Sequence, residues 1–189
     1  PPAPLEDLLW ESLTDPQCGF SMAQTAENLA EKYQLTREEV DAYAERSQRL
    51  AKQAWDQGVF DDEVVTVQVR DPKTRQMVPF RADEHMRPGT TVAALAKLAP
   101  YFKKDGLVTA GNASGICDGA AACVVASEDV ARAKGLQPLG RLVGWAVAGV
   151  EPKYMGLGPA PAIRKLLTKT GMTLDAMDLI EVNEAFAPQ

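Results

Sequence analysis

The sequence predicts an α/β protein. Capped amphipathic helices occupy its first third, a β-branched hairpin follows, and strand-like and helix-like runs alternate in its last third. Such alternation is typical of a parallel or mixed sheet covered by helices. A chain of 189 residues, 46% hydrophobic and 24% charged, is long enough for one large domain or two small ones.

Two helix starts in the first third share one capping pattern. Ser21 is followed three residues later by Gln24, and Thr36 by Glu39. At this spacing each side chain satisfies a free backbone N–H of the other residue. After the second start, apolar and small side chains recur at intervals of three and four until Gly58, which predicts an amphipathic helix of about five turns.

A hairpin is predicted after this helix. The run Val64–Val69 is rich in β-branched residues, the polar stretch 71–76 is typical of a turn, and Met77–Phe80 predicts the returning strand.

Strands and helices are predicted to alternate after residue 120. In order, they are the apolar run AACVVA, a helix over Ser127–Lys134, a strand-like stretch over Leu139–Val150, a helix over Pro159–Thr170 and a strand over Leu179–Val182. Glycines directly after both helices favour those ends. The motif NEAFA then predicts the start of another helix, and the first residues, PPAPLEDLLW, predict no strand that could begin such a sheet. We therefore expect the chain to be cut from a longer protein at both ends. A change to glycine- and alanine-rich composition over 105–119 predicts a domain boundary.

The charge of the chain is unevenly distributed. The net charge of −6 argues against a general nucleic-acid binder, yet seven cations and only two acids lie between residues 73 and 104. This basic island fits either a compact anionic ligand or a solvated face of an ordinary domain. We expect neither a membrane span nor a targeting segment within the 189 residues.

Two glycine-rich motifs allow alternatives. GNASG, at 111–115, resembles a serine-hydrolase elbow with its serine displaced by one position, and His85 is the only histidine available as a base. GLGPAP, at 156–161, resembles the start of a dinucleotide loop but lacks its third glycine. A helix start at Pro159 explains that motif equally well.

The three cysteines predict no metal site. They form no CxxC pair, and one histidine is too few to complete a cluster, so we expect a reducing compartment. Cys123 lies in an apolar run and is predicted to be in the core. Cys18 and Cys117 lie beside glycines and are interpreted as ordinary free thiols.

Six segments in order along the chain resemble the thiolase family, most closely the mitochondrial 3-ketoacyl-CoA thiolases of fatty-acid β-oxidation. They are SMAQTAENLAEKY, REEVDAYAERSQ, DEHMRPGTT, KDGLVTAGNASGICDGAAA, MGLGPAPA and VNEAFA. The resemblance implies a thiolase-like α/β fold in which a CoA-binding loop domain of helices and a β-hairpin is inserted between two half-domains. Residues 1–117 are similar to the loop domain, 118–136 to the end of the N-terminal half-domain, and 137–189 to the start of the C-terminal half-domain.

The resemblance also implies roles for single residues. Asn183 of NEAF is similar to the asparagine that holds a water in an oxyanion hole. The positions that match CoA- and substrate-binding residues are Arg87, Thr90, Ser114, Met155 and Phe186. A guanidinium suits phosphate or adenine, and a hydroxyl suits a pantetheine amide. The family's nucleophilic cysteine, its GHP histidine and its CxGGG cysteine have no counterparts in the 189 residues.

The activity implied for the intact protein is CoA-dependent cleavage of a 3-ketoacyl-CoA to acetyl-CoA and a shortened acyl-CoA. Coenzyme A is then a substrate, and no tightly bound cofactor is expected. The resemblance further implies a homo-oligomer, a dimer or tetramer, in the mitochondrial matrix. The alternatives are a biosynthetic acetoacetyl-CoA thiolase, which the absence of an HMG motif at Phe20 to Met22 disfavours, and a non-catalytic CoA- or nucleotide-binding module.

Overall fold

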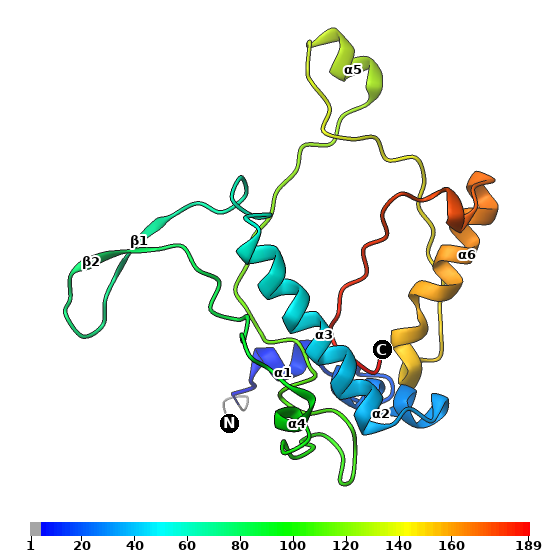
Figure 1. The fold of residues 1–189 in the computed structure, drawn as a ribbon. Helices are drawn as coiled ribbons and strands as arrows, with labels where there is room; N and C mark the ends of the chain where they lie inside the picture. Colours follow the sequence, from blue (N-terminus) through cyan, green and yellow to red (C-terminus); the bar gives the residue numbers. More distant parts are fainter. Residues whose placement is uncertain (1–4) are drawn as a thin grey trace. The chain divides into compact units, whose positions relative to one another are not determined.

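The computed structural model of the chain describes residues 5–189. The chain divides into two units. Figure 1 shows the helices and strands of both. The first unit contains the residues up to Thr25 together with Ile116–Asn183, and the second contains Ala26–Gly115 together with Glu184–Gln189.

The second unit is built on three helices, α2 (Met22–Tyr33), α3 (Arg37–Asp56) and α4 (Val92–Leu95). Most of α2 belongs to this unit. The capping box at the start of α3 is present as predicted: the Thr36 hydroxyl accepts the Glu39 N–H, and the Glu39 carboxylate accepts the Thr36 N–H. The helix ends at Asp56, with Gln57 as its C-cap, and Gly58 follows with φ of +70°, a conformation that glycine adopts without strain.

The core of the second unit lies between these helices and the loop that follows α4. Its buried apolar side chains are Ala26, Leu29, Ala30, Val40, Ala44, Leu95 and Val108. The predicted apolar face of α3 is buried only in part: Val40 is buried, whereas Tyr43 and Leu50 are about two-fifths exposed.

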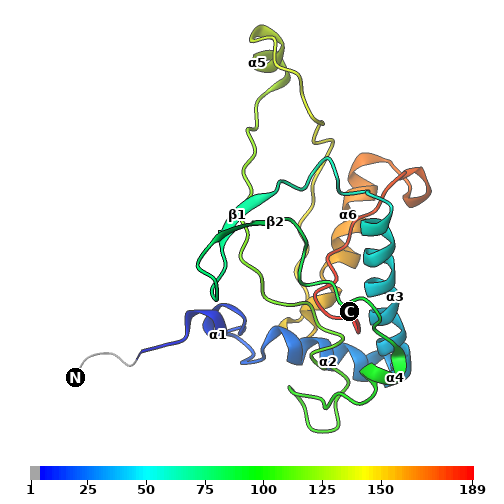
Figure 2. The same ribbon diagram turned by 60° about the vertical axis from the view of Figure 1, so that its left-hand side comes forward.

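The predicted hairpin is confirmed. Strand β1 (Val67–Arg70) pairs antiparallel with β2 (Met77–Phe80), with Val67 opposite Phe80. In the turn, the Asp71 carboxylate accepts the N–H groups of Thr74 and Lys73, and these bonds, that of Thr74 first, lower the pKa of Asp71. The hairpin stands apart from α2, α3 and α4 in both views (Figures 1 and 2).

The first unit holds helices joined by extended chain. Its elements are α1 (Leu8–Ser12), α5 (Glu128–Ala133), η1 (Pro152–Leu157), α6 (Pro159–Thr170) and η2 (Leu174–Ala176). The predicted start at Pro159 and the predicted glycine end at Gly171, with φ of +70°, are both confirmed for α6. Ser127 caps α5, which lies at the end of two extended segments (Figure 2).

The capping box predicted at Ser21 is also present. The Ser21 N–H donates to the Gln24 side chain at 2.8 Å, and the Gln24 N–H donates to the Ser21 hydroxyl at 3.3 Å. Both bonds stay within the first unit. The local capping rule therefore held at both predicted positions.

Three strand predictions differ from the structure. The runs at 121–126, 139–150 and 179–182 belong to no hydrogen-bonded ladder in the described part of the chain, where β1 and β2 form the one sheet. A strand is completed only by a partner whose backbone groups pair with its own. Most of their large apolar side chains are exposed, and Val124 is 93% exposed.

Cys123 is exposed, so the prediction that it lies in the core is wrong for this structure. Its apolar neighbours have no packed layer to cover them. Cys117 is exposed as well, and Cys18 is half-buried. All three are free thiols.

Within residues 5–189, no helix combines the length and the apolar character needed to cross a bilayer.

Candidate functional site

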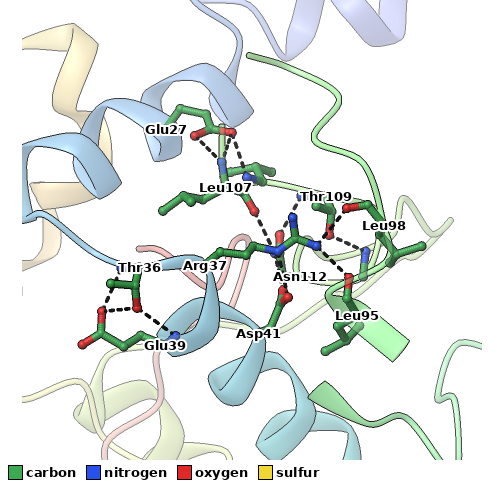
Figure 3. Close-up of polar contacts among 12 residues, drawn as sticks. Glu27, Thr36, Arg37, Glu39, Asp41, Leu95, Leu98, Leu107, Thr109 and Asn112 are labelled. Atoms are coloured by element: carbon green, nitrogen blue, oxygen red, sulfur yellow. Dashed lines mark hydrogen bonds and ion pairs between the residues drawn. The ribbon is translucent and has the colours of Figure 1, made fainter. Parts of the chain in front are cut away.

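A buried polar network joins α3 to the segment that contains NASG (Figure 3). The Arg37 guanidinium donates to the Asp41 carboxylate at 2.7 Å and to the carbonyl oxygens of Leu95 and Leu98 at 2.6 and 2.9 Å. The other carboxylate oxygen of Asp41 accepts from the Asn112 amide at 2.9 Å. Because the Asp41 side chain is 1% exposed, these bonds replace water for a buried charge.

Asn112 is the centre of this network. Its side-chain amide also donates to the Leu107 carbonyl at 2.9 Å, and its side-chain oxygen accepts the Thr109 N–H at 2.7 Å. The residue is 3% exposed. The first residue of NASG is therefore fixed by three hydrogen bonds of its side chain to groups on α3 and on its own loop.

Glu27 of α2 secures the same loop from the other side. Its carboxylate accepts the N–H of Leu107 at 2.9 Å and that of Val108 at 2.7 Å. A Cβ at Gly106 would lie 2.3 Å from this carboxylate, so the approach requires glycine. Glu27 is buried, and backbone N–H groups satisfy its charge.

The NASG segment pairs with the NEAFA segment through their backbones. The Ser114 N–H donates to the Ala185 carbonyl at 2.8 Å, the Ala187 N–H donates to the Asn112 carbonyl at 2.9 Å, and Ala113 forms an antiparallel bridge with Phe186. The helix predicted to start at NEAFA is not present in residues 184–189, because this backbone pairs with NASG instead. Ser114 and Phe186, two predicted site residues, are thus neighbours.

Glu184 connects NEAFA to α3. Its carboxylate accepts hydrogen bonds from the Ser47 hydroxyl at 2.5 Å and the Tyr43 hydroxyl at 2.7 Å. These bonds, that of Ser47 first, hold the pKa of Glu184 below its ordinary value. The same carboxylate raises the pKa of Tyr43. Tyr43 and Ser47 lie one turn apart on a single face of α3.

Arg87 and Thr90 share a turn that is also attached to α3. The Arg87 N–H donates to the side-chain oxygen of Gln48 at 2.8 Å, and the Thr90 hydroxyl donates to the Arg87 carbonyl at 2.8 Å. Gly89, between them, has φ of +81°. The Arg87 side chain is exposed. A fixed backbone with an exposed guanidinium can bind an anion without first ordering the turn.

His85 lies next to the NASG segment. Its Nε2 accepts the Gly115 N–H at 3.1 Å. That lone pair is therefore occupied and cannot take the proton of Ser114, which removes support from the hydrolase alternative. His85 is exposed, and its ring accepts this backbone hydrogen bond.

Two predicted site residues belong to the first unit. Met155 lies in η1 and is 39% exposed, and Asn183 is exposed at the end of the extended stretch after η2. Arg87, Thr90, Ser114 and Phe186 all belong to the second unit. Sequence reasoning missed the residues that hold these four in place, chiefly Asp41, Asn112, Gln48 and Glu184. The i,i+4 spacing of Arg37 and Asp41 was the one local pattern that could have indicated an ion pair at this place on α3.

Within residues 5–189, no group of His, Cys, Asp and Glu side chains is arranged to hold a metal ion.

Comparisons with known proteins agree with this arrangement of motifs. The model of the thiolase N-terminal domain matches residues 3–129, and that of the thiolase C-terminal domain matches residues 136–189. The chain belongs to the thiolase family. Its fold is accordingly the thiolase α/β fold, of which it contains a part.

Single relatives give the same result. The chain is 54% identical over 185 residues to the mitochondrial 3-ketoacyl-CoA thiolase of Homo sapiens, covering 98% of this chain and 46% of that protein. It is 51% identical, with the same coverage, to an acetyl-CoA acetyltransferase of Syntrophomonas wolfei. The crystal structure of human mitochondrial 3-ketoacyl-CoA thiolase in complex with CoA matches with a TM-score of 0.85 and 52% identity, over 97% of this chain and 45% of that one. The chain spans about half the length of the relatives it matches.

Proposed function

We propose that these residues act within a longer thiolase polypeptide, the intact enzyme, that cleaves 3-ketoacyl-CoA with CoA. The products are acetyl-CoA and an acyl-CoA shortened by two carbons. One observation carries the proposal: 98% of the chain aligns at 54% identity with a mitochondrial 3-ketoacyl-CoA thiolase. Since the chain spans under half of that relative, the nucleophilic cysteine and the GHP and CxGGG motifs would be supplied by the rest of the intact enzyme.

Coenzyme A is the proposed substrate of the second unit. Arg87 would contact the phosphate or adenine part, and Thr90 and Ser114 the polar groups of the pantetheine. The exposed guanidinium on a fixed turn supports the first role, and the backbone pairing of the NASG segment supports the second. Since the Thr90 hydroxyl already donates to the Arg87 carbonyl, Thr90 would act as an acceptor. Met155 and Phe186 would line the acyl and pantetheine tunnel.

Asn183 is the proposed catalytic residue of this chain. Cleavage of the carbon–carbon bond releases an enolate of acetyl-CoA, whose thioester oxygen carries the developing charge. The Asn183 side chain would hold a water that donates to this oxygen, while the acyl group passes to a cysteine elsewhere in the intact enzyme. The alternative, that Asn183 caps a helix beginning at Glu184, loses support because residues 184–189 form a bridge and a turn.

A biosynthetic acetoacetyl-CoA thiolase is the second candidate. It is favoured by the acetyl-CoA acetyltransferases among the relatives, one of which is 51% identical to this chain. Both candidates use the same chemistry and differ in acyl chain length.

The domain limits follow from the proposed relationship. Residues 1–117 would form the loop domain, 118–136 the end of the N-terminal half-domain and 137–189 the start of the C-terminal half-domain. We also propose that the intact enzyme is a homo-oligomer and that it lies in the mitochondrial matrix. The names of the mitochondrial relatives support the location and do not bear on the oligomer.

The decisive experiment measures thiolysis by the purified intact enzyme with a long-chain 3-ketoacyl-CoA and with acetoacetyl-CoA. We expect turnover of both, with the higher kcat/KM for the longer substrate. A preference for acetoacetyl-CoA would select the second candidate. CoA binding without turnover of either substrate would support a non-catalytic CoA-binding module instead.

A further inference from the structure

Two of the segments proposed to contact CoA in the second unit are joined by one side chain, His85. The turn that carries Arg87 and the NASG segment that carries Ser114 are distant in sequence. His85 lies two residues before Arg87, and its Nε2 accepts the N–H of Gly115, the residue after Ser114, at 3.1 Å. In this bond Nε2 is the acceptor and the backbone N–H is the donor.

The contact is close as well as polar. A Cβ built on Gly115 would lie 1.9 Å from His85 Cε1 and 2.7 Å from Nε2. The three atoms nearest to that Cβ all belong to the His85 ring. Gly115 is not among the residues with positive φ, so its backbone conformation suits any L-residue. The imidazole ring is therefore what a side chain at position 115 would meet first.

Both ends of this link are held independently. On one side, the Asp83 carboxylate accepts the His85 N–H at 2.9 Å, and Gln48 of α3 holds the Arg87 N–H. On the other side, the Ser114 N–H is bound to Ala185. The imidazole bond therefore joins two anchored segments and adds the restraint that sets the distance between them.

We infer that His85 is a positioning residue for CoA, and that it fixes the Arg87 turn against the NASG segment before the ligand arrives. The inference rests on the proposed function. A ligand that spans both segments binds more tightly when their spacing is set in advance, because less ordering is required on binding. His85 acts through Arg87 and Ser114 and makes no contact of its own with the reacting atoms.

The test uses variants of the intact enzyme that distinguish the effect of the hydrogen-bond acceptor from the effect of the aromatic ring. His85→Phe keeps a ring and loses the acceptor. We expect it to weaken CoA affinity in calorimetric titration by about 3- to 10-fold, the factor to which one neutral hydrogen bond corresponds. His85→Gln places an oxygen near the position of Nε2 and should restore most of the affinity. In His85→Phe the KM for CoA should rise while kcat remains close to the wild-type value. A general loosening of the fold would not produce this combination.

Gly115→Ala supplies the complementary variant. Alone, it should weaken CoA binding because the new Cβ displaces the ring. In the His85→Ala background the obstacle is gone, so Gly115→Ala should add no further loss. An equal loss in both backgrounds, or wild-type affinity in His85→Phe, would overturn the inference.

Hydrogen exchange at the Gly115 amide, measured without CoA, tests the imidazole contact separately from the thiolase activity. Faster exchange in His85→Phe than in His85→Gln is expected whether or not the protein is a thiolase, and equal exchange in the two would overturn the inference. If the wild-type enzyme binds no CoA while this difference is present, the proposed function fails and the contact stands.

Discussion

Replacing Asp41 with alanine should destabilise the second unit strongly. Asp41 accepts one hydrogen bond from Arg37 at 2.7 Å and one from Asn112 at 2.9 Å, and its side chain is 1% exposed. In Asp41→Ala the Arg37 side chain, which is 24% exposed, loses its carboxylate partner. The link from α3 to NASG is lost as well.

The magnitude follows from the bonds that are lost and those that remain. Hydrogen bonds to a charged group contribute about 1.5–3 kcal/mol each, and breaking a buried ion pair costs roughly 3–5 kcal/mol. Arg37 keeps its bonds to Leu95 and Leu98, and Asn112 keeps its bond to Leu107, which limits the loss. We therefore expect a loss of about 3 kcal/mol in the free energy of unfolding, at the lower end of that range.

The assay is urea unfolding of the intact enzyme, with a matched ion pair as control. Glu45 and Arg49 form a second i,i+4 pair on α3, at 3.5 Å, with side chains 27% and 57% exposed. Glu45→Ala should cost only about 0.5 kcal/mol. Asp41→Asn keeps the volume but turns an amide donor toward Arg37 or Asn112, so it should retain most of the Asp41→Ala loss. A loss no greater than that of the Glu45→Ala control would refute the reasoning.

Four further outcomes are expected. Arg87→Ala should weaken CoA binding in titration by about 1–3 kcal/mol, whereas Lys73→Ala, in the same basic island, should leave the affinity unchanged. Asn183→Asp should lower kcat by roughly 100-fold with folding intact, and a normal kcat would remove Asn183 from the catalytic residues. The depressed pKa of Glu184 means that its stabilising contribution is complete above the unfolded value of about 4.3 and is lost as pH falls through the folded pKa. Wild type and Glu184→Gln should therefore converge in stability at low pH, and parallel unfolding curves across pH would contradict this. The 189-residue chain alone should show no thiolysis in the assay of the intact enzyme, because covalent catalysis needs the matching nucleophile.

The three extended runs of the first unit, at 121–126, 139–150 and 179–182, have sequences typical of strands. Their β-branched and apolar residues predict strands, and 179–182 leads directly to Asn183. The structure shows them extended without a ladder in the part of the chain that it describes. Pattern alone identifies a strand-forming segment, whereas the partner that completes the strand is a property of the assembled sheet.

The sequence by itself determined the local elements and the family. The capping boxes at Ser21 and Thr36, the end of α3 before Gly58, the hairpin and the full extent of α6 were all predictable, because each depends on residues within a few positions of one another. Six motifs in order sufficed for the thiolase family.

Only the tertiary structure decided what holds the proposed CoA-binding residues in place. Asn112 and Asp41 are separated by 71 positions, and Tyr43 and Glu184 by 141. No periodicity or motif relates residues so far apart, since their contact exists only after helices and loops have packed. The same holds for His85 and Gly115, whose separation is 30 positions. Interactions between neighbouring residues determine the helices and turns. The contacts between distant residues depend on the burial of charge, because a buried carboxylate is stable only beside donors that replace its water.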